Sequence, residues 1–411
     1  MRAYERLIEY SKIWTTSDEE GSTTPSTERQ FDLARYLSEE MKALGISDVE
    51  VDEHCYVYGS IPATPGYEDR TAIGLIAHLD TAPDYCGENV KPQIHENYDG
   101  GRLEIGNGKA LDPAVFPHLK GLKGHTLITT DGTTLLGADD KAGIAEIMTL
   151  AQTLLQSPGE EIPHGPVRIA FTPDEEIGSG AHLLDLEKLK AQYAYTIDGG
   201  APEEITYETF NAATATFEIN GTNVHPGSAK GIMKNAALIA CEISAMLPSA
   251  ETPANTQGYE GFFHLFEMEG SVEKASLRYL IRDHSAEHFE IRQEMLRMIE
   301  KTVNERYGDG TCTLTIRQQY RNMEEKIRPC MHLVDTAKDA MRELGLEPDT
   351  SPVRGGTDGS ELSFRGLPCP NLGTGGYAFH GPMEHITAEN MDTVVRILLG
   401  IIRRYAGKNT N

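Results

Sequence analysis

Three short runs of apolar residues punctuate the first half of the chain. They span residues 72–79 (AIGLIAHL), 167–171 (VRIAF) and 193–197 (YAYTI). Continuous rather than alternating apolar runs of this length are typical of strands covered on both faces, as in a parallel sheet. Each run ends in polar residues, in HLD, TPDEE and DGG respectively. Because ligands of open α/β sheets gather at the carboxyl ends of the strands, these three ends predict a functional site.

Helical periodicity surrounds these runs. Apolar residues recur about every 3.6 positions in four segments, at 31–44, 144–155, 333–344 and 393–405. At the start of the first segment, Thr27 and Gln30 predict a capping box, and Gly45 predicts its C-cap. Residues 84–136 are rich in Gly, Pro and Asn, and they predict loops with short hairpins that are too polar to form a core.

The pattern changes from about residue 208. Strand-like segments at 215–219, 262–272, 276–283 and 311–319 alternate with helical segments at 235–247 and 285–307. This β-α-β-β-α-β order is that of a ferredoxin-like unit, which indicates an inserted domain. We therefore predict an α/β protein in which a mixed central sheet is flanked by helices. Residues 1–207 and 321–411 would form this discontinuous domain, and residues 208–320 an inserted α+β domain.

Length and charge narrow the functional classes. A chain of 411 residues is long for one core, and its net charge of −26 argues against nucleic acid or an anionic membrane as partner. No segment is apolar enough to span a membrane, and the amino terminus lacks the features of a secretory signal, so we expect a cytosolic protein. The six cysteines are scattered, which favours reduced thiols and leaves histidine and carboxylate as the available metal ligands.

The three consecutive acids Asp174, Glu175 and Glu176 repel one another unless a cation or a shared proton offsets their charge. Other strand ends and loops supply suitable ligands for a cation, and the candidates are His78, Asp139, Glu176, Asp198 and His380. Nitrogen and oxygen donors without sulfur suit zinc, manganese or cobalt. Asp80 shares a strand face with His78 and would orient its imidazole, while Glu175 is free to take a proton from water.

Each candidate also has a purely structural interpretation. A single histidine is more often a core or surface residue, and acidic pairs such as Asp139-Asp140 usually lie at helix starts or on solvated faces. His225 in NVHPG and Arg354 in RGGTDG are ordinary turn and loop residues when taken alone. It is much harder to explain three strand ends that all carry metal-ligating residues as ordinary surface residues. Their joint occurrence therefore favours a metal site.

At these residues the sequence resembles the peptidase T family of tripeptide aminopeptidases, a branch of the co-catalytic di-zinc metallopeptidases. That larger group includes carboxypeptidase G, succinyl-diaminopimelate desuccinylase and aminoacylase. The resemblance covers essentially the whole chain. It rests on AHLDT (77–81), TLLGADDKAGIAEIM (134–148), AFTPDEEIGSGA (170–181), YTIDGG (195–200), NVHPGSAKG (223–231), YEGFFHL (259–265), RGGTDG (354–359) and TGGYAFHG (374–381).

The resemblance implies two zinc ions per subunit, for which manganese or cobalt substitutes. The implied ligands are His78, Asp139, Glu176, Asp198 and His380, with Asp139 bridging the ions and joined to Asp140 by a cis peptide. Glu175 matches the general base and Asp80 the orienting acid. His225 matches a lid histidine that stabilises the oxyanion, and Arg282 and Arg354 are candidates for gripping the carboxylate of the peptide. The inserted domain would act as a lid and form a homodimer.

The implied activity is release of the N-terminal residue from unblocked tripeptides in intracellular peptide turnover. One alternative is a related di-zinc dipeptidase or amidohydrolase that acts on another amide. A second alternative is an inactive metal-binding relative, although such proteins typically lose a ligand or the base and none is missing here.

Overall fold

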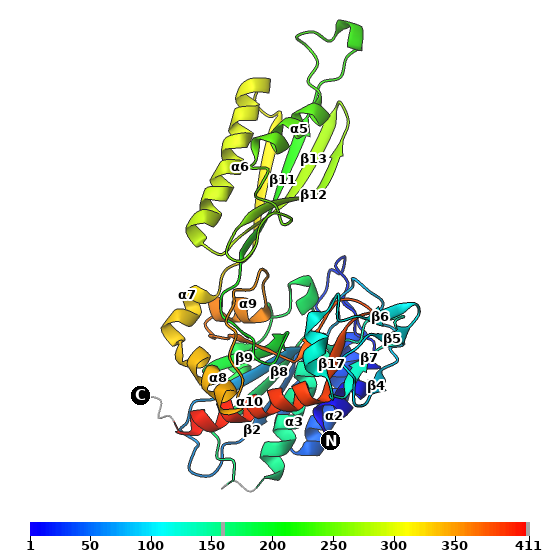
Figure 1. Ribbon diagram of the computed structural model, residues 1–411. Helices are drawn as coiled ribbons and strands as arrows, with labels where there is room; N and C mark the ends of the chain where they lie inside the picture. Colours follow the sequence, from blue (N-terminus) through cyan, green and yellow to red (C-terminus); the bar gives the residue numbers. More distant parts are fainter. Residues whose placement is uncertain (158–160, 408–411) are drawn as a thin grey trace. The chain divides into compact units, whose positions relative to one another are not determined.

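The computed structural model describes residues 1–157 and 161–407, which divide into two compact units. Unit 1 comprises Met1–Tyr207, Met323–Ser351 and Thr357–Asn411, and unit 2 comprises Glu208–Asn322 and Pro352–Gly356. The first unit is thus built from separate stretches of the chain (Figure 1). The short stretch Pro352–Gly356 belongs to unit 2, whereas the sequence prediction placed it in the first domain.

The core of unit 1 is a seven-stranded mixed sheet. In spatial order its strands are β1 (Ser47–Val51), β2 (Val57–Ile61), β8 (Val167–Thr172), β3 (Ile73–His78), β9 (Tyr193–Gly199), β15 (Asn371–Gly373) and β10 (Ile205–Thr206). The four strands β8, β3, β9 and β15 run parallel, and β1, β2 and β10 pair in antiparallel fashion at the two edges. The predicted α/β class with a mixed central sheet is confirmed.

Helices cover both faces of this sheet. One face and its large apolar core are covered by α1 (Ala3–Ser11), α2 (Gln30–Leu44), α3 (Ala138–Gln156), α8 (His332–Glu343) and α10 (Ala388–Gly407). Helices α3 and α10 pack against each other there (Figure 1). A smaller core on the opposite face involves α4 (Leu186–Leu189) and α9 (Asp358–Phe364), and the short helix α7 (Glu324–Ile327) packs against α9. Burial on both faces explains why the central strands are continuously apolar.

Residues 84–136 form more than loops. They contribute β4 (Gln93–His95) and β7 (Leu127–Thr129) to a second sheet with β16 (Gly376–Tyr377) and β17 (His385–Thr387), and they also form the hairpin β5 (Leu103–Gly106) and β6 (Lys109–Leu111). The expectation that this segment is too polar for a core is wrong. Its few apolar side chains gather into a small core of their own, made of Tyr98, Ile105, Leu111, Leu119, Leu122 and Leu127.

Unit 2 has the ferredoxin-like order that the sequence predicts. Its elements are β11 (Asn211–Asn220), α5 (Ala236–Met246), β12 (Phe262–Gly270), β13 (Lys274–Asp283), α6 (Ala286–Tyr307) and β14 (Cys312–Tyr320). The strands form an antiparallel sheet in the order β12-β13-β11-β14. Helices α5 and α6 pack on one face of it over a separate apolar core.

Within the described ranges 1–157 and 161–407, no helix combines the length and the apolar character needed to cross a membrane. All six cysteines lie in these ranges and are free thiols.

Candidate metal centre

The candidate ligands converge at one edge of the central sheet. His78 is the last residue of β3, Asp198 lies near the end of β9, and Glu175 and Glu176 form a short 3-10 helix just after β8. Because β8, β3 and β9 are neighbouring parallel strands, their carboxyl ends meet at the same edge. Asp139 reaches this edge from the start of α3.

His78 and Asp139 form the middle of the cluster. The Nε2 atom of His78 lies 3.0 Å from Asp139 Oδ1 and 3.5 Å from Asp198 Oδ1. The second oxygen of Asp139 faces the opposite way, 3.2 Å from Nε2 of His380. Asp139 therefore stands between the two imidazoles, as a bridging carboxylate would. It is joined to Asp140 by a cis peptide bond, as the resemblance implies.

His380 completes the other side of the cluster. It lies in the loop between β16 and β17, and its Nε2 atom is 3.0 Å from Oε2 of Glu176. Its Nδ1 atom faces Oδ2 of Asp84 at 3.5 Å. Each imidazole of the cluster thus has a carboxylate on its far nitrogen, because His78 Nδ1 lies 3.3 Å from Oδ1 of Asp80.

Asp80 also makes contacts that the sequence did not predict. Its fully buried carboxylate accepts hydrogen bonds from the backbone amides of Glu175 at 3.0 Å and Glu176 at 3.2 Å. His78 Nδ1 is also 3.0 Å from the backbone oxygen of Asp80. Asp80 therefore fixes the imidazole and the two consecutive glutamates relative to each other.

The electrostatics of the cluster indicate a shortage of positive charge. Burial raises the pKa of Glu176 to about 7 and of Asp198 to about 6, and it raises the pKa of Glu175 well above 4.5. Hydrogen bonds to Asp139 and Glu176 raise the pKa of His380 to about 11. Burial opposes a charged His78, yet Asp198 and the other acids around it raise its pKa well above 6.5. The positive charges that act on Asp139 and Glu176 come from the imidazoles of His78 and His380.

The donor set fits divalent metal ions. Around a tetrahedral ion with bonds of 2.0–2.1 Å, neighbouring donor atoms are about 3.3 Å apart, and the contacts through the two Nε2 atoms span 3.0–3.5 Å. Oε1 of Glu176 is buried and has no hydrogen-bond partner in the part of the chain that the structure describes, so this oxygen is left to bind an ion. Two groups in the described part of the chain could hold an ion, namely His78, Glu175 and Asp198, and His78, Asp139 and Glu176.

Asp174, the first of the three consecutive acids, points away from this cluster. Its carboxylate accepts hydrogen bonds from the amide and hydroxyl of Ser26 at 2.7 and 2.6 Å, and from Nε2 of Gln30 at 2.6 Å. Oε1 of Gln30 accepts the amide of Asp174 in return, at 3.2 Å. The predicted capping box of Thr27 and Gln30 is wrong, because the N-cap is Arg29 and the Gln30 side chain is engaged by Asp174. Gly45, in contrast, is the C-cap of α2.

The three predicted substrate residues all lie in unit 2. His225 is exposed, and its Nδ1 accepts the amide of Gly227 at 3.1 Å. Arg282 donates to the backbone oxygens of Ala213 and Ile281 at 3.3 and 3.0 Å. Their contact with a substrate stays a prediction.

Arg354 is occupied within its own unit. Its guanidinium donates to the backbone oxygens of Gly258 and Glu260 at 3.0 and 2.8 Å, and its carbon Cζ lies 5.0 Å from the ring centre of Phe210. To grip a carboxylate it would have to exchange these partners.

Three acids near the centre carry no local sequence signal. Asp84 contacts His380, as described above. Asp358, which is 7% exposed, accepts a hydrogen bond of 2.9 Å from the hydroxyl of Thr172, and burial raises its pKa to about 7. Glu384 accepts three backbone amides at the start of α3. Their proximity depends on chain crossings that spacing along the sequence does not reveal.

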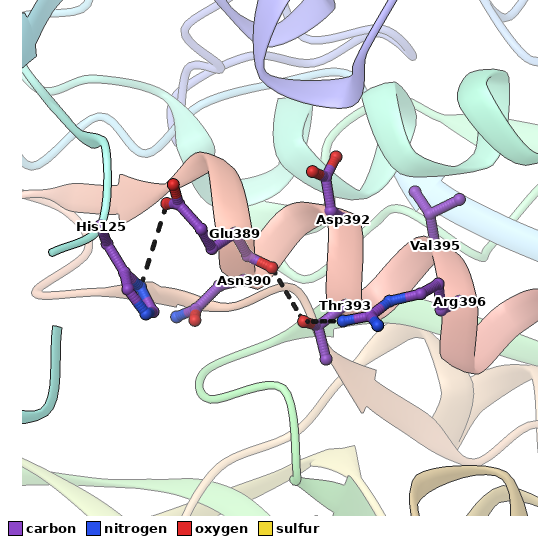
Figure 2. Close-up of a pocket in the computed structure, with 7 residues that line it drawn as sticks. All are labelled: His125, Glu389, Asn390, Asp392, Thr393, Val395 and Arg396. Atoms are coloured by element: carbon purple, nitrogen blue, oxygen red, sulfur yellow. Dashed lines mark hydrogen bonds and ion pairs between the residues drawn. The ribbon is translucent and has the colours of Figure 1, made fainter. Parts of the chain in front are cut away.

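A separate pocket lies over the start of α10. Figure 2 shows that it is lined by His125 and by side chains along the helix, including Glu389 and Arg396. The hydroxyl of Thr393 accepts a hydrogen bond of 3.0 Å from Arg396 there. None of the residues that line it belongs to the predicted centre.

The fold and this cluster define a metallopeptidase of known class. The chain belongs to peptidase family M20/M25/M40, whose profile matches residues 129–404. Peptidase T of Clostridium perfringens (strain 13 / Type A) is 52% identical over 407 residues, which cover 99% of this chain and 100% of that protein. The resemblance noted in the sequence is confirmed, and the protein is a peptidase.

Solved structures agree on the fold. The crystal structure of aminopeptidase PepT from Bacillus cereus ATCC 10987 superposes with a TM-score of 0.79 at 23% identity, covering 99% of this chain and 98% of that one. The Bacillus subtilis YXEP protein, a dinuclear metal-binding peptidase of family M20, superposes with a TM-score of 0.67 at 14% identity, covering 98% and 97%.

Proposed function

We propose that the protein is a cytoplasmic tripeptide aminopeptidase that releases the N-terminal residue from unblocked tripeptides. The observation that carries this proposal is the bridging position of Asp139 between His78 and His380, with Glu175 and Glu176 held beside it by Asp80. The full-length relatives named peptidase T support the choice of substrate. Free cysteines and an acidic chain without a membrane-spanning helix in its described part are compatible with the cytoplasm.

The residues that would hold two zinc ions are His78, Asp139, Glu176, Asp198 and His380. This donor set of imidazoles and carboxylates also suits manganese and cobalt. When bound, such ions supply Lewis acidity toward the peptide carbonyl and the attacking water.

The remaining chemistry belongs to side chains of the protein. Glu175 takes a proton from the attacking water and passes it to the leaving amine nitrogen. This partly exposed residue lies beside His78 and Asp198 in the cluster, and no side-chain hydrogen bond fixes its carboxylate among the described residues. Asp80 fixes the positions of Glu175 and His78 relative to each other through its contacts with the Glu175 amide and with Nδ1 of His78. His225 would stabilise the oxyanion, and Arg282 or Arg354 would pair with the carboxylate of the peptide, as arginine does in bidentate fashion.

A substrate panel tests the activity. The proposal predicts efficient cleavage of free-amine tripeptides and no cleavage of the same tripeptides after N-acetylation, with release of the first residue followed by chromatography. Preference for N-acylated substrates or dipeptides would instead favour the related amidohydrolases or dipeptidases.

Substitution of the base gives a second test. Glu175→Ala should keep its bound metal and lose at least about a hundredfold in kcat, since general acid–base catalysis contributes about 10²–10⁴-fold. A variant that keeps zinc and full activity removes Glu175 from the mechanism.

We also propose that unit 2 forms the interface of a homodimer. Strand β12 is an edge of its sheet, and Phe266 and Met268 on it are 40% and 43% exposed. An edge strand offers unpaired backbone groups for pairing with a second copy. Light scattering should give twice the chain mass for the wild type and a lower mass for Phe266→Lys, and a monomeric wild type contradicts the proposal.

A further inference from the structure

Glu384 lies outside the proposed ligand set, but it is buried against the segment that carries the central ligand. Its side chain is 1% exposed, and it precedes β17 by one residue. Oε2 accepts the backbone amides of Leu136 and Gly137 at 2.7 and 2.8 Å, and Oε1 accepts the amide of Asp139 at 3.0 Å. One buried carboxylate therefore holds three amides of a single turn.

This turn is the entry to α3. The first amides of a helix have no partner within the helix, and a nearby side chain usually satisfies them. Here the structure shows no cap from the N-cap residue, Gly137, which has a positive φ of 75°. Among the amides of α3, Glu384 accepts that of Asp139, the second helical residue, from 245 positions away in the sequence, and its other two amides belong to Leu136 and the N-cap Gly137 just before the helix.

The same contact connects two ligand-bearing segments. Glu384 follows His380 by four residues, and its own amide donates to the oxygen of Gly381 at 3.2 Å. Its carboxylate thereby ties the loop of His380 to the turn of Asp139, whose two oxygens face His380 and His78. A shift of this turn would move the bridging ligand relative to both imidazoles.

We propose that Glu384 is a positioning residue of the metal centre, which acts by fixing the backbone of Asp139 and so the placing of its bridging carboxylate. The inference rests on the proposed metal centre and concerns a residue outside the proposed ligand set. An uncharged amide cannot replace the carboxylate. In Glu384→Gln, the amide oxygen can accept on one side, but the NH₂ group then faces a backbone N–H and leaves that donor unsatisfied.

The test measures zinc affinity of the purified, metal-stripped full chain by competition with a chromophoric chelator. Substitution of residues that orient metal ligands typically costs about 10–100-fold in metal affinity. Glu384→Gln should therefore bind zinc about 10–100-fold more weakly than the wild type, with both ions affected because Asp139 is shared. Wild-type affinity in folded Glu384→Gln overturns the proposal.

Glu389→Gln is the matched control. Glu389 also accepts a backbone amide, that of Thr126 at 2.8 Å, but it lies at the start of α10 and contacts none of the proposed ligands. Its variant should bind zinc like the wild type. An equal loss in both variants would show a general structural effect and would also overturn the proposal.

If Glu384→Gln does not fold, a structure of the zinc-bound wild type tests the proposal instead. A crystal structure should show the Glu384 oxygens within hydrogen-bond distance of the amides of Gly137 and Asp139, and a carboxylate turned away from them contradicts the proposal. Failure of the proposed function looks different, because the wild type would then bind zinc and leave tripeptides intact.

Discussion

At the scale of single residues, the three consecutive acids after β8 have three different environments. Asp174 contacts the segment before α2, Glu175 lies partly exposed beside His78 and Asp198, and Glu176 contacts His380. The sequence indicated that three adjacent carboxylates need compensation, but not that Ser26 and Gln30 provide it for the first. That pairing depends on how α2 packs, which no spacing of residues reveals.

Asp174 should matter for catalysis through its neighbours. In Asp174→Asn, one oxygen remains to accept on one side, but the NH₂ group then faces either the amide of Ser26 or Nε2 of Gln30 and leaves that donor unsatisfied, so the loop with both glutamates is anchored less firmly. A displacement of about 1 Å can cost about a hundredfold in rate. We expect kcat for a tripeptide to fall by about tenfold or more, with KM changed much less.

The control for this prediction is Asp18→Asn, in the same segment. The Asp18 carboxylate accepts only the nearby amide of Glu20, at 3.0 Å, among the hydrogen bonds described. Steady-state kinetics of both variants test the prediction, and Asp18→Asn should keep the wild-type kcat. A wild-type kcat in a folded Asp174→Asn variant would refute the anchoring role of Asp174.

Glu146 is a buried acid without a function in the proposed mechanism. It lies within α3, it is fully buried, and neither carboxylate oxygen has a hydrogen-bond partner among residues 1–157 and 161–407. Burial, followed by the charge of Asp392, raises its pKa well above 4.5. Above pH 4.5 the unfolded chain loses this proton while the folded chain retains it, so the residue lowers stability increasingly as the pH rises.

Glu146→Met should therefore stabilise the protein. An unsatisfied buried polar group costs about 1–3 kcal/mol, and we expect a gain of about this size at pH 7 that becomes smaller toward pH 4.5. Urea unfolding across this pH range measures it. Glu39→Met, at a position that is 77% exposed, should change stability little, and a destabilised Glu146→Met variant would contradict the assignment.

At the scale of elements, the sheet positions the centre. Apolar runs predicted β3, β8 and β9 and the site at their ends, because strands buried on both faces have a simple sequence pattern. The core in residues 84–136 was missed, since its six apolar side chains are spread over turns without period. The loop of His380 was found only by its motif, and its support by β7 and β17 follows from pairing between distant segments.

Gly143 controls how closely α3 approaches β9. A Cβ atom at this position would lie 2.0 Å from the backbone oxygen of Ile197 and 2.5 Å from Oδ1 of Asp140. Gly143→Ala must therefore push the start of α3 away from the strand that carries Asp198. We expect a loss of about 1–3 kcal/mol in unfolding free energy, the usual cost of overpacking, together with weaker activity.

Gly121→Ala is the comparison for this substitution. No atom of the described residues lies within 4 Å of a Cβ placed at Gly121, and its φ is not left-handed. Thermal unfolding should show a change within about 0.5 kcal/mol there. Equal stability of the two alanine variants would mean that the helix adjusts without cost.

At the scale of the whole molecule, the sequence predicted two domains and a ferredoxin-like insertion, because strand and helix order is local information. The sequence pattern did not predict that Pro352–Gly356 belongs to unit 2. Arg354 stacks on Phe210 and bonds to the 256–260 loop there, and these contacts arise only once the chain has folded. The sequence therefore predicted the candidate ligands and the base of the centre more fully than the residues that hold these side chains in place.

Hydrolysis of tripeptides is proposed to depend on metal ions held at the edge of this sheet. Its most direct test is the rate at which the purified protein cleaves a free-amine tripeptide before chelation, after removal of metal, and after zinc is returned. We expect cleavage to disappear with the metal and to be restored by about two zinc ions per chain. Undiminished cleavage by protein shown to be metal-free would contradict it.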